Sequence, residues 1–503
     1  WTFIESKYEE LLDLVPGISG VFLVLNETQF SLLHEQSLPF KTRTQVTADD
    51  HLRQLILTVH NVLNRRGKRL IVRTFGTSLK DIELIARVIE TLPDGITVDV
   101  MSKATACDFF GFRYPDNPAF DRLTGQSRIL EETVGEFRGK THIVCTPTDF
   151  YATRIRRAAR RGLTGVVVRV DHNGYPKSNF ESANLLNLHL ISKLWIDPND
   201  NVPVIVRNWL SDRYSPKASE QLAKAFGRTE HIWEQATNTL GHYSVSAHGN
   251  LPPLYQGAYC AWDNLNASVR RIAGITDLKD DHEAIPLSGK EATWRADGRK
   301  LLRPNFTTLE RIHEEVTEAN HQARCALEEV TSVADLLTAS DRGTLLREFR
   351  VLENATRLFG HLKRTFFLGL QAGQDPLRRP ELLRTALGTT REAIEAGYEI
   401  EQRFGRNHWP VQPDDQRGAS LYQILTDAWS GHLFELTLSS QRSLPGGGWD
   451  YQLGPHRPVG RLWKALIEAG RPDASTLASL QVQLEHSVKF TEDGQHMIIT
   501  VND

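Results

Sequence analysis

The run Gly165-Val166-Val167-Val168-Arg169-Val170 consists almost wholly of β-branched valines. A strand that is buried on both faces has this composition, and such strands belong to parallel sheets covered by helices. Helical patterns at His51–Arg66 and Leu79–Thr91 alternate with earlier runs of the same kind, which indicates βαβ units. The earlier runs are Gly20–Leu25, Arg69–Thr74, Ile96–Met101 and Arg128–Thr133. The sequence therefore predicts an α/β fold with a parallel sheet.

Polar or charged clusters follow the runs, as at Asn26-Glu27 and at 102–108. In parallel barrels the C-terminal strand ends carry the chemistry, so we expect a (β/α)8 TIM-type barrel followed by a mainly helical C-terminal region. Five strands are apparent where such a barrel needs eight, with Thr141–Cys145 as a short additional candidate. An open five-stranded sheet would leave two unpaired edges. We therefore expect truncated first strands before Trp1, closure by another chain, or strands that the pattern does not reveal.

Four segments follow from this organisation. Residues 178–214 have a helical pattern, and 241–300 are rich in His, Gly, Pro and Trp without clear periodicity. From Thr307 to about Arg403 apolar residues recur at spacings of three, four and seven, which predicts a bundle face interrupted at Asp375-Pro376. A short strand is expected at Met497–Val501. The predicted segments are a catalytic barrel portion (1–215), a loop-rich region bordering the site (216–305), a helical domain (306–440) and a C-terminal extension (441–503).

The composition and net charge of the chain exclude several classes of protein. The chain of 503 residues is 40% apolar and 24% charged, and its net charge of −3 provides no basic footprint for nucleic acid. The sequence contains no run of about 20 apolar residues, so no membrane segment is predicted. Four scattered cysteines without a C-x-x-C pair, and 18 histidines without metal-ligand spacing, predict neither metal nor organic cofactor. No targeting segment is recognisable, and the compartment stays open.

Carboxylates follow three of the predicted strands, namely Glu27, Asp108 and Glu136. A carboxylate at a strand mouth can act as a general acid if its surroundings raise its pKa, and two at neighbouring strands can activate one water. Taken singly, each fits a solvated, capping or structural residue better. Arg73 ends an otherwise buried strand and needs a carboxylate or a ligand as partner, so an ion pair and substrate binding both remain open.

A basic run lies at helical spacing after the fourth strand. Because its members recur as they would along one helix, we interpret them as the solvated face of a barrel helix rather than an anion site. The run comprises Arg154, Arg156, Arg157, Arg160 and Arg161.

Together these segments resemble the family 67 glycoside hydrolases, the xylan α-glucuronidases, or a divergent relative of them. Phe22-Leu23-Val24 before Glu27 is similar to that family's fourth strand, and Val72-Arg73-Thr74-Phe75 to its fifth. Lys103–Phe109, which contains Asp108, resembles its sixth. Gly135-Glu136-Phe137-Arg138-Gly139 resembles its seventh, continued by Thr141-His142-Ile143-Val144. Residues 187–198 are similar to the helix after its eighth strand, so the likeness extends over about residues 18–215.

The resemblance implies an exo-acting, inverting glycosidase that removes a terminal uronic acid or related sugar from a polysaccharide or oligosaccharide. It implies that Glu27 is the acid, and that Asp108 and Glu136 together orient and deprotonate the attacking water. The implied substrate-binding residues are Arg73, Lys103, His142 and Asn187. The partner is then a carbohydrate, and a homodimer through the helical domain is a further expectation.

One departure from the family concerns the sugar. The family has a lysine that binds the glucuronate carboxylate at the position of Leu25. Either the sugar has no carboxylate and Arg73 binds hydroxyls, or a basic residue from elsewhere replaces the lysine, and the first option is favoured. Two other classes of function also remain: a carbohydrate-binding protein without turnover, and a helical interaction protein carried by residues 307–440.

Overall fold

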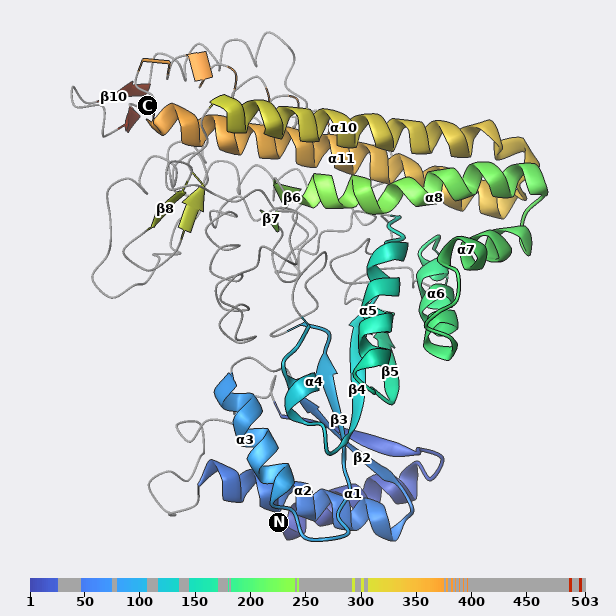
Figure 1. The fold of residues 1–503 in the computed structure, drawn as a ribbon, viewed down its shortest axis with the longest axis vertical. Coiled ribbons are helices and arrows are strands. Elements are labelled where there is room, and N and C mark those ends of the chain that lie inside the picture. Colours follow the sequence, from blue (N-terminus) through green and yellow to red (C-terminus); the bar gives the residue numbers. More distant parts are fainter. Residues whose placement is uncertain are drawn as a thin grey trace.

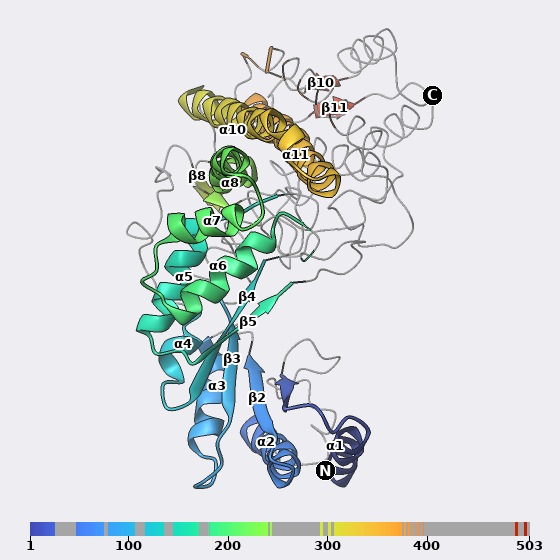
Figure 2. The same ribbon diagram turned by 90° about the vertical axis from the view of Figure 1, so that its right-hand side faces the viewer.

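The chain forms a small parallel sheet with helices packed on it, joined to a bundle of long helices (Figures 1 and 2). In Figure 1 the sheet lies toward one end of the molecule and the bundle lies across the other. The computed structural model describes residues 1–25, 47–74, 79–105, 116–134, 144–170, 180, 182–239, 242–243, 292–294, 300–302, 306–374, 377–378, 381–382, 385, 389, 392, 396, 488–490 and 497–499.

The sheet contains five parallel strands whose order in space is their order along the chain. Each connection therefore moves one strand onward in the same direction, which curls the sheet into a half-barrel. The prediction of a parallel α/β sheet is confirmed, whereas the described residues do not complete an eight-stranded barrel. The strands are β1 (Gly20–Val24), β2 (Arg69–Thr74), β3 (Asp99–Lys103), β4 (Ser127–Thr133) and β5 (Gly165–Arg169).

The third strand begins three residues later than the sequence suggests. Gly95 adopts a φ of 84°, in the left-handed region that glycine tolerates, and the Ile96 amide donates to the Pro93 carbonyl in the turn. The chain joins the sheet only at Asp99, which pairs with Ile71. The additional strand predicted at Thr141–Cys145 is not formed at residues 144–145, and its other residues lie outside the described part of the chain.

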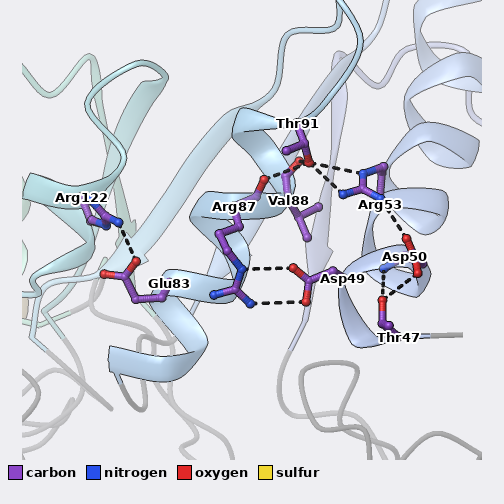
Figure 3. A network of polar contacts seen from close by, with 9 residues as sticks. All are labelled: Thr47, Asp49, Asp50, Arg53, Glu83, Arg87, Val88, Thr91 and Arg122. Carbon is purple, nitrogen blue, oxygen red and sulfur yellow. Dashed lines mark hydrogen bonds and ion pairs between the residues drawn. The ribbon is translucent and has the colours of Figure 1, made fainter.

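Helices cover the outer face of the sheet, and polar contacts between exposed side chains join three of them (Figure 3). Thr47 caps α2 by accepting the Asp50 amide at 3.1 Å. Arg87 of α3 forms a salt bridge with Asp49 of α2 at 3.2 Å. Exposed pairs of this kind contribute little stability, about 0–1 kcal/mol each, so they orient helices that apolar packing holds. These helices are α1 (Thr2–Leu14), α2 (Ala48–Arg65), α3 (Leu79–Glu90) and α4 (Ala119–Arg122).

Successive residues of a strand point to opposite faces of the sheet, so the buried strand residues fall into two sets. Leu70, Val72 and Val100 point outward into the core shared with α1–α4. Ile71, Met101 and Ile129 lie on the opposite, inner face and form a small apolar cluster of their own, against which Val167 packs. We call Ile71, Met101, Ile129 and Val167 the apolar floor of the inner face.

Beyond the sheet the chain is helical, as the sequence predicts for 178–214 and for 307 onward. The helices α8, α10 and α11 pack together as a bundle, and one apolar core runs from β4 through α5 to α11. The helix α11 ends directly before Asp375-Pro376, as expected from the missing amide of proline. The helices are α5 (Thr148–Arg160), α6 (Leu185–Ile196), α7 (Val202–Ser211), α8 (Pro216–Thr237), α10 (Phe306–Ser332) and α11 (Ala339–Gln374).

The segment 216–305, predicted to be loop-rich, begins with the 22 residues of α8. The short strands β6 (Asn238–Thr239), β7 (His242–Tyr243), β8 (Ala292–Trp294) and β9 (Lys300–Leu302) follow it. At the C-terminal side β10 (Val488–Phe490) pairs with β11 (Met497–Ile499), which agrees with the expected strand there. The division into four domains stays a prediction. Among the described helices, none is long and apolar enough to cross a membrane.

Candidate active site at the carboxyl edge of the sheet

The three predicted catalytic carboxylates, Glu27, Asp108 and Glu136, lie outside the described residues, as does His142. The described strands nevertheless fix where their segments leave the sheet. Glu27 comes two residues after Leu25, which continues β1 by donating its amide to the Arg73 carbonyl at 3.4 Å. Glu136 comes two residues after Val134, which continues β4. Asp108 comes five residues after Lys103, the last residue of β3, so all three carboxylates follow carboxyl ends of strands in one parallel sheet, where barrel enzymes place their chemistry.

A layer of four charged residues stands directly above the apolar floor of the inner face. Each lies two positions after a floor residue on its strand, so each projects from the same face. The pairs are Ile71 and Arg73 on β2, Met101 and Lys103 on β3, Ile129 and Glu131 on β4, and Val167 and Arg169 on β5. We call Arg73, Lys103, Glu131 and Arg169 the charged layer.

Arg73 and Glu131 form a bidentate ion pair across the charged layer. Arg73 Nε lies 2.6 Å from Glu131 Oε2, and Arg73 Nη2 lies 2.7 Å from Glu131 Oε1. The side chain of Arg73 is 11% exposed and that of Glu131 only 4%. Two parallel charge-assisted hydrogen bonds hold the planar guanidinium in one orientation. The ion pair expected as one option for Arg73 is thus present, and its role toward substrate stays a prediction.

Lys103 is the last residue of β3 and is almost fully buried, although its side chain is among the largest in the interior. It pairs in register with Glu131 of β4. A buried ammonium requires compensation by anionic or hydrogen-bonding groups. Arg169, half-buried at the end of β5, adds a third cation, so the charged layer carries three formal positive charges and one negative charge.

Leu25 does not belong to the inner face. Its side chain is fully buried and packs with Leu23 in the core that the sheet shares with the helices α1–α4. Whatever residue occupied this position, its side chain would point toward the helices rather than toward a substrate above the sheet. The leucine therefore carries no information about the charge of the sugar.

Asn187 holds the chain near the β4 loop. It lies in α6 and is fully buried, and its side-chain Nδ2 donates to the backbone carbonyl of Cys145 at 2.8 Å. Asn184, the N-cap residue of α6, accepts the Cys145 amide at 2.8 Å. The two asparagines thereby clamp the peptide at Cys145, shortly after the segment 135–143. A contact between Asn187 and substrate remains a prediction.

The interpretation of the basic run as a solvated helix face is wrong for Arg154. Its side chain is 5% exposed, because it lies on the same face of α5 as the buried residues Tyr151, Ile155 and Ala158. Its Nε lies 3.4 Å from Asp116 Oδ1, and its Nη1 lies 3.6 Å from Glu132 Oε2. Arg161 also forms an ion pair with Asp116. Arg160, by contrast, is exposed as expected.

Glu131 and Arg169 were not recognised from the sequence as site residues. The signal that identifies them is positional: each lies two residues beyond an apolar residue on the inner face. The sequence alone does not show this, because apolar residues of β4 and β5 point to both faces of the sheet. The signal can be used only once Ile129 and Val167 are known to lie on the inner face.

The sequence matches no protein-family model and no curated protein. Among solved structures, the chain is similar to a GH138 enzyme targeting pectin rhamnogalacturonan II, with a TM-score of 0.55 and 11% sequence identity. The chain has a glycoside-hydrolase-like fold. The alignment covers 88% of this chain and 53% of the enzyme, so the chain spans about half the length of the structure it matches.

A second similar structure is a family GH115 4-O-methyl-α-glucuronidase with specificity for decorated arabinogalactans. Its TM-score is 0.43 at 10% identity, covering 86% of this chain and 47% of that one. The similarity to the GH138 enzyme supports a glycoside-hydrolase-like fold and does not single out family 67.

Proposed function

We propose that the chain provides the active-site half of an exo-acting, inverting glycoside hydrolase that removes a terminal uronic acid from a polysaccharide or oligosaccharide. The observation that carries the proposal is the charged layer, in which the Arg73–Glu131 pair, Lys103 and Arg169 stand above an apolar floor at the carboxyl edge of the half-barrel. The glycoside-hydrolase-like fold supports the reaction class, and the order of the carboxylates, after β1, β3 and β4 of one parallel sheet, supports the residue roles.

In this mechanism Glu27 donates its proton to the glycosidic oxygen as the bond from that oxygen to the anomeric carbon breaks. Asp108 and Glu136 orient one water on the opposite face of the sugar and accept its proton as its oxygen bonds to the same carbon. The sugar is released with inverted configuration. An inverting site needs acid and base carboxyl groups about 6.5–9.5 Å apart, which leaves room for the water.

The charge of the layer favours a uronate over a neutral sugar. Burying a carboxylate without a partner costs several kcal/mol, so a uronate site must supply cations. The sequence favoured a neutral sugar because Leu25 replaces a lysine, but Leu25 faces the helices. On the inner face, Lys103 and Arg169 accompany Arg73, and within the layer these three cations outnumber the single carboxylate of Glu131. In this proposal the sugar carboxylate is bound by the cations of the charged layer and not by the residue at position 25.

The test compares kcat/KM for an aryl glucuronide and the matching aryl glucoside, within a panel of α- and β-linked substrates. We expect a preference for the glucuronide of at least about a hundredfold, or ~2.7 kcal/mol at 1.36 kcal/mol per decade. NMR of the first-formed sugar should show the anomer opposite to that of the substrate. Equal rates would contradict the uronate, and a retained anomer would contradict the paired base. Sugar binding without turnover on the whole panel would favour the non-catalytic alternative.

A further inference from the structure

The Arg73–Glu131 pair crosses the middle of the sheet. Arg73 lies on β2 and Glu131 on β4, and β3 runs between these two strands. Two strand spacings separate their backbones by about 9–10 Å, so the two side chains meet above β3. On β3, Met101 is level with Arg73, and Lys103 is level with Glu131. The guanidinium of Arg73 is therefore held above a strand other than its own.

The geometry of this pair fixes the direction of the guanidinium. Arg73 Nε lies against one oxygen of Glu131 and Nη2 against the other, at 2.6 and 2.7 Å. Two parallel hydrogen bonds determine both the plane of the guanidinium and its rotation within that plane. An arginine without such a partner can adopt many rotamers, and each would place its charge differently. The position of the Arg73 charge above the sheet therefore depends on Glu131.

A second arginine–carboxylate pair lies on the same face, at the amino ends of the strands, and its geometry differs. Arg69 of β2 donates from both Nε and Nη2 to a single oxygen, Asp99 Oδ2 of the neighbouring strand β3, at 2.9 and 2.6 Å. The side chain of Arg69 is 64% exposed, against 11% for Arg73. Exposed ion pairs hold their side chains weakly. The buried pair that uses both carboxylate oxygens is thus specific to the carboxyl ends of the strands, where the proposed site lies.

Glu131 itself is unsuited to contact a uronate. Its carboxylate has the same charge as that of the sugar, and its side chain is only 4% exposed. Its influence on such a sugar must therefore pass through Arg73, the cation that it holds. We propose that Glu131 is a positioning residue that gives the site its preference for a uronate, because it holds the Arg73 guanidinium in the orientation that receives the sugar carboxylate. This inference rests on the proposed function, in which the charged layer binds that carboxylate.

Glu131→Asp tests the inference, because it keeps the charge and shortens the side chain by one methylene group. The carboxylate then withdraws toward β4 and can no longer meet both Nε and Nη2 of Arg73. The kcat/KM for an aryl glucuronide should fall by about 10- to 100-fold, the usual contribution of one charge-assisted hydrogen bond. The loss should appear mainly in KM, since the sugar carboxylate is bound equally in the ground state and the transition state. The matching glucoside has no carboxylate, so its kcat/KM should change by less than about threefold.

Binding of free D-glucuronate, measured by calorimetry, provides a second readout that needs no turnover. Its Kd should rise in Glu131→Asp by the same factor as the loss in kcat/KM. Asp99→Glu is the matched control, because it changes the carboxylate of the second pair by one methylene group, keeps its charge and lies on the same face. It should match the wild type in both measurements. If Glu131→Asp does not fold, Glu131→Gln takes its place. Glutamine has the same shape and offers one acceptor oxygen for two guanidinium N–H groups, so the same loss is expected.

A double-mutant cycle tests whether Glu131 acts through Arg73. Arg73→Lys keeps the charge and removes the fork that pairs with Glu131. In that background Glu131→Asp should add less than about twofold to the loss on the glucuronide, since no guanidinium is left to orient. Losses that multiply independently would show that Glu131 acts on the sugar by another route, and would overturn the inference.

Equal losses on glucuronide and glucoside in Glu131→Asp would reduce the pair to a structural contact and overturn the inference, as would an unchanged or greater preference for the glucuronide. Either result leaves the proposed function intact, because the wild type still prefers the glucuronide. Failure of the proposed function has a different signature: the wild type then hydrolyses no glycoside of the panel. The inference would survive that result if the wild type bound D-glucuronate and Glu131→Asp bound it more weakly. It would fall with the proposed function if the wild type bound none.

Discussion

Arg73 shows how much of the proposed site depends on single side chains. As a charge at the end of a buried strand it had to have a partner, and the structure supplies Glu131 in a bidentate pair. This pair sets the guanidinium at a defined height above the apolar floor. In the proposed function, the cations on β2, β3 and β5 receive the carboxylate of the sugar.

Replacement of Glu27 by glutamine tests the acid at this scale. A glutamine cannot protonate the departing oxygen, so hydrolysis of alkyl glycosides should fall by about 10²–10⁴-fold, the usual contribution of general acid catalysis. Dinitrophenyl glycosides should be spared, because their leaving group needs no proton. Steady-state rates on both substrate types provide the measurement. Equal losses on the two would remove Glu27 from this role.

The sequence could not show which face of the sheet a strand residue lies on, or which helix residues are buried, and Leu25 and Arg154 show why. In a strand such as β5, valines occupy positions that point to both faces of the sheet, so the sequence of the strand does not show which of these positions face the helices. Leu25 turned out to face them. Arg154 has the spacing of a solvated arginine, and only the approach of Glu132 and Asp116 makes its burial tolerable. Both depend on partners that lie far away along the chain.

At the scale of elements, periodicity predicted the helices at 51–66, at 79–91 and from 307 onward, because each buries a regular apolar stripe, but it missed α1 and α8. Periodicity does not predict the first and last residues of an element, nor the contacts at which two elements pack closely. The start of β3 shifted because a glycine turn delays the strand, and the α10–α11 contact depends on a glycine that periodicity ignores. Gly360 of α11 is buried where the helices cross, and a Cβ there would lie 2.5 Å from Val316 Cγ1 of α10.

Gly360→Ala should therefore destabilise the protein even though alanine is the better helix former. Val316 is β-branched and cannot easily rotate away, so overpacking should lower the free energy of unfolding by about 1–3 kcal/mol. Gly343→Ala in the same helix is the control. Gly343 is exposed with no atom within 4 Å of the added Cβ, so this change should stabilise by about 0.5–1 kcal/mol. Urea unfolding midpoints that moved in the same direction would contradict the packing account.

At the scale of the whole molecule, the bundle is attached to the sheet region through helix N-termini. Neither Pro147, before α5, nor Asn184, before α6, provides a side-chain cap. Glu348 of α11 accepts the Ala183 amide at 2.8 Å, directly before α6. Glu230 of α8 accepts the first-turn amides of α5. Carboxylates suit this place, because a helix N-terminus presents unpaired N–H groups and a positive partial charge.

The Glu230 contact predicts a specific dependence of stability on pH. Its two oxygens accept the amides of Asp149 and Phe150 at 3.1 and 3.2 Å, which favours the charged carboxylate. Burial acts more strongly in the opposite direction, and with the nearby charges of Asp149 and Glu234 it raises the pKa of Glu230 from 4.5 to about 7. Between these two values the folded protein holds a proton that the unfolded chain has lost.

Stability falls with rising pH wherever the folded state binds more protons than the unfolded state. The contribution of Glu230 should therefore decline from about pH 4.5 to about pH 7 and stay constant above that. Glu230→Gln removes the titration and keeps an acceptor for α5. Its stability relative to the wild type should rise across this window by on the order of 2–3 kcal/mol, at 1.36 kcal/mol per pKa unit. Urea unfolding at pH 5 and pH 8 measures the difference. Glu220→Gln, an exposed change on the same helix, should show no such trend. If Glu230→Gln and the wild type lost stability in parallel between these pH values, the α5–α8 contact would not titrate, and the amides of α5 would hold Glu230 charged throughout.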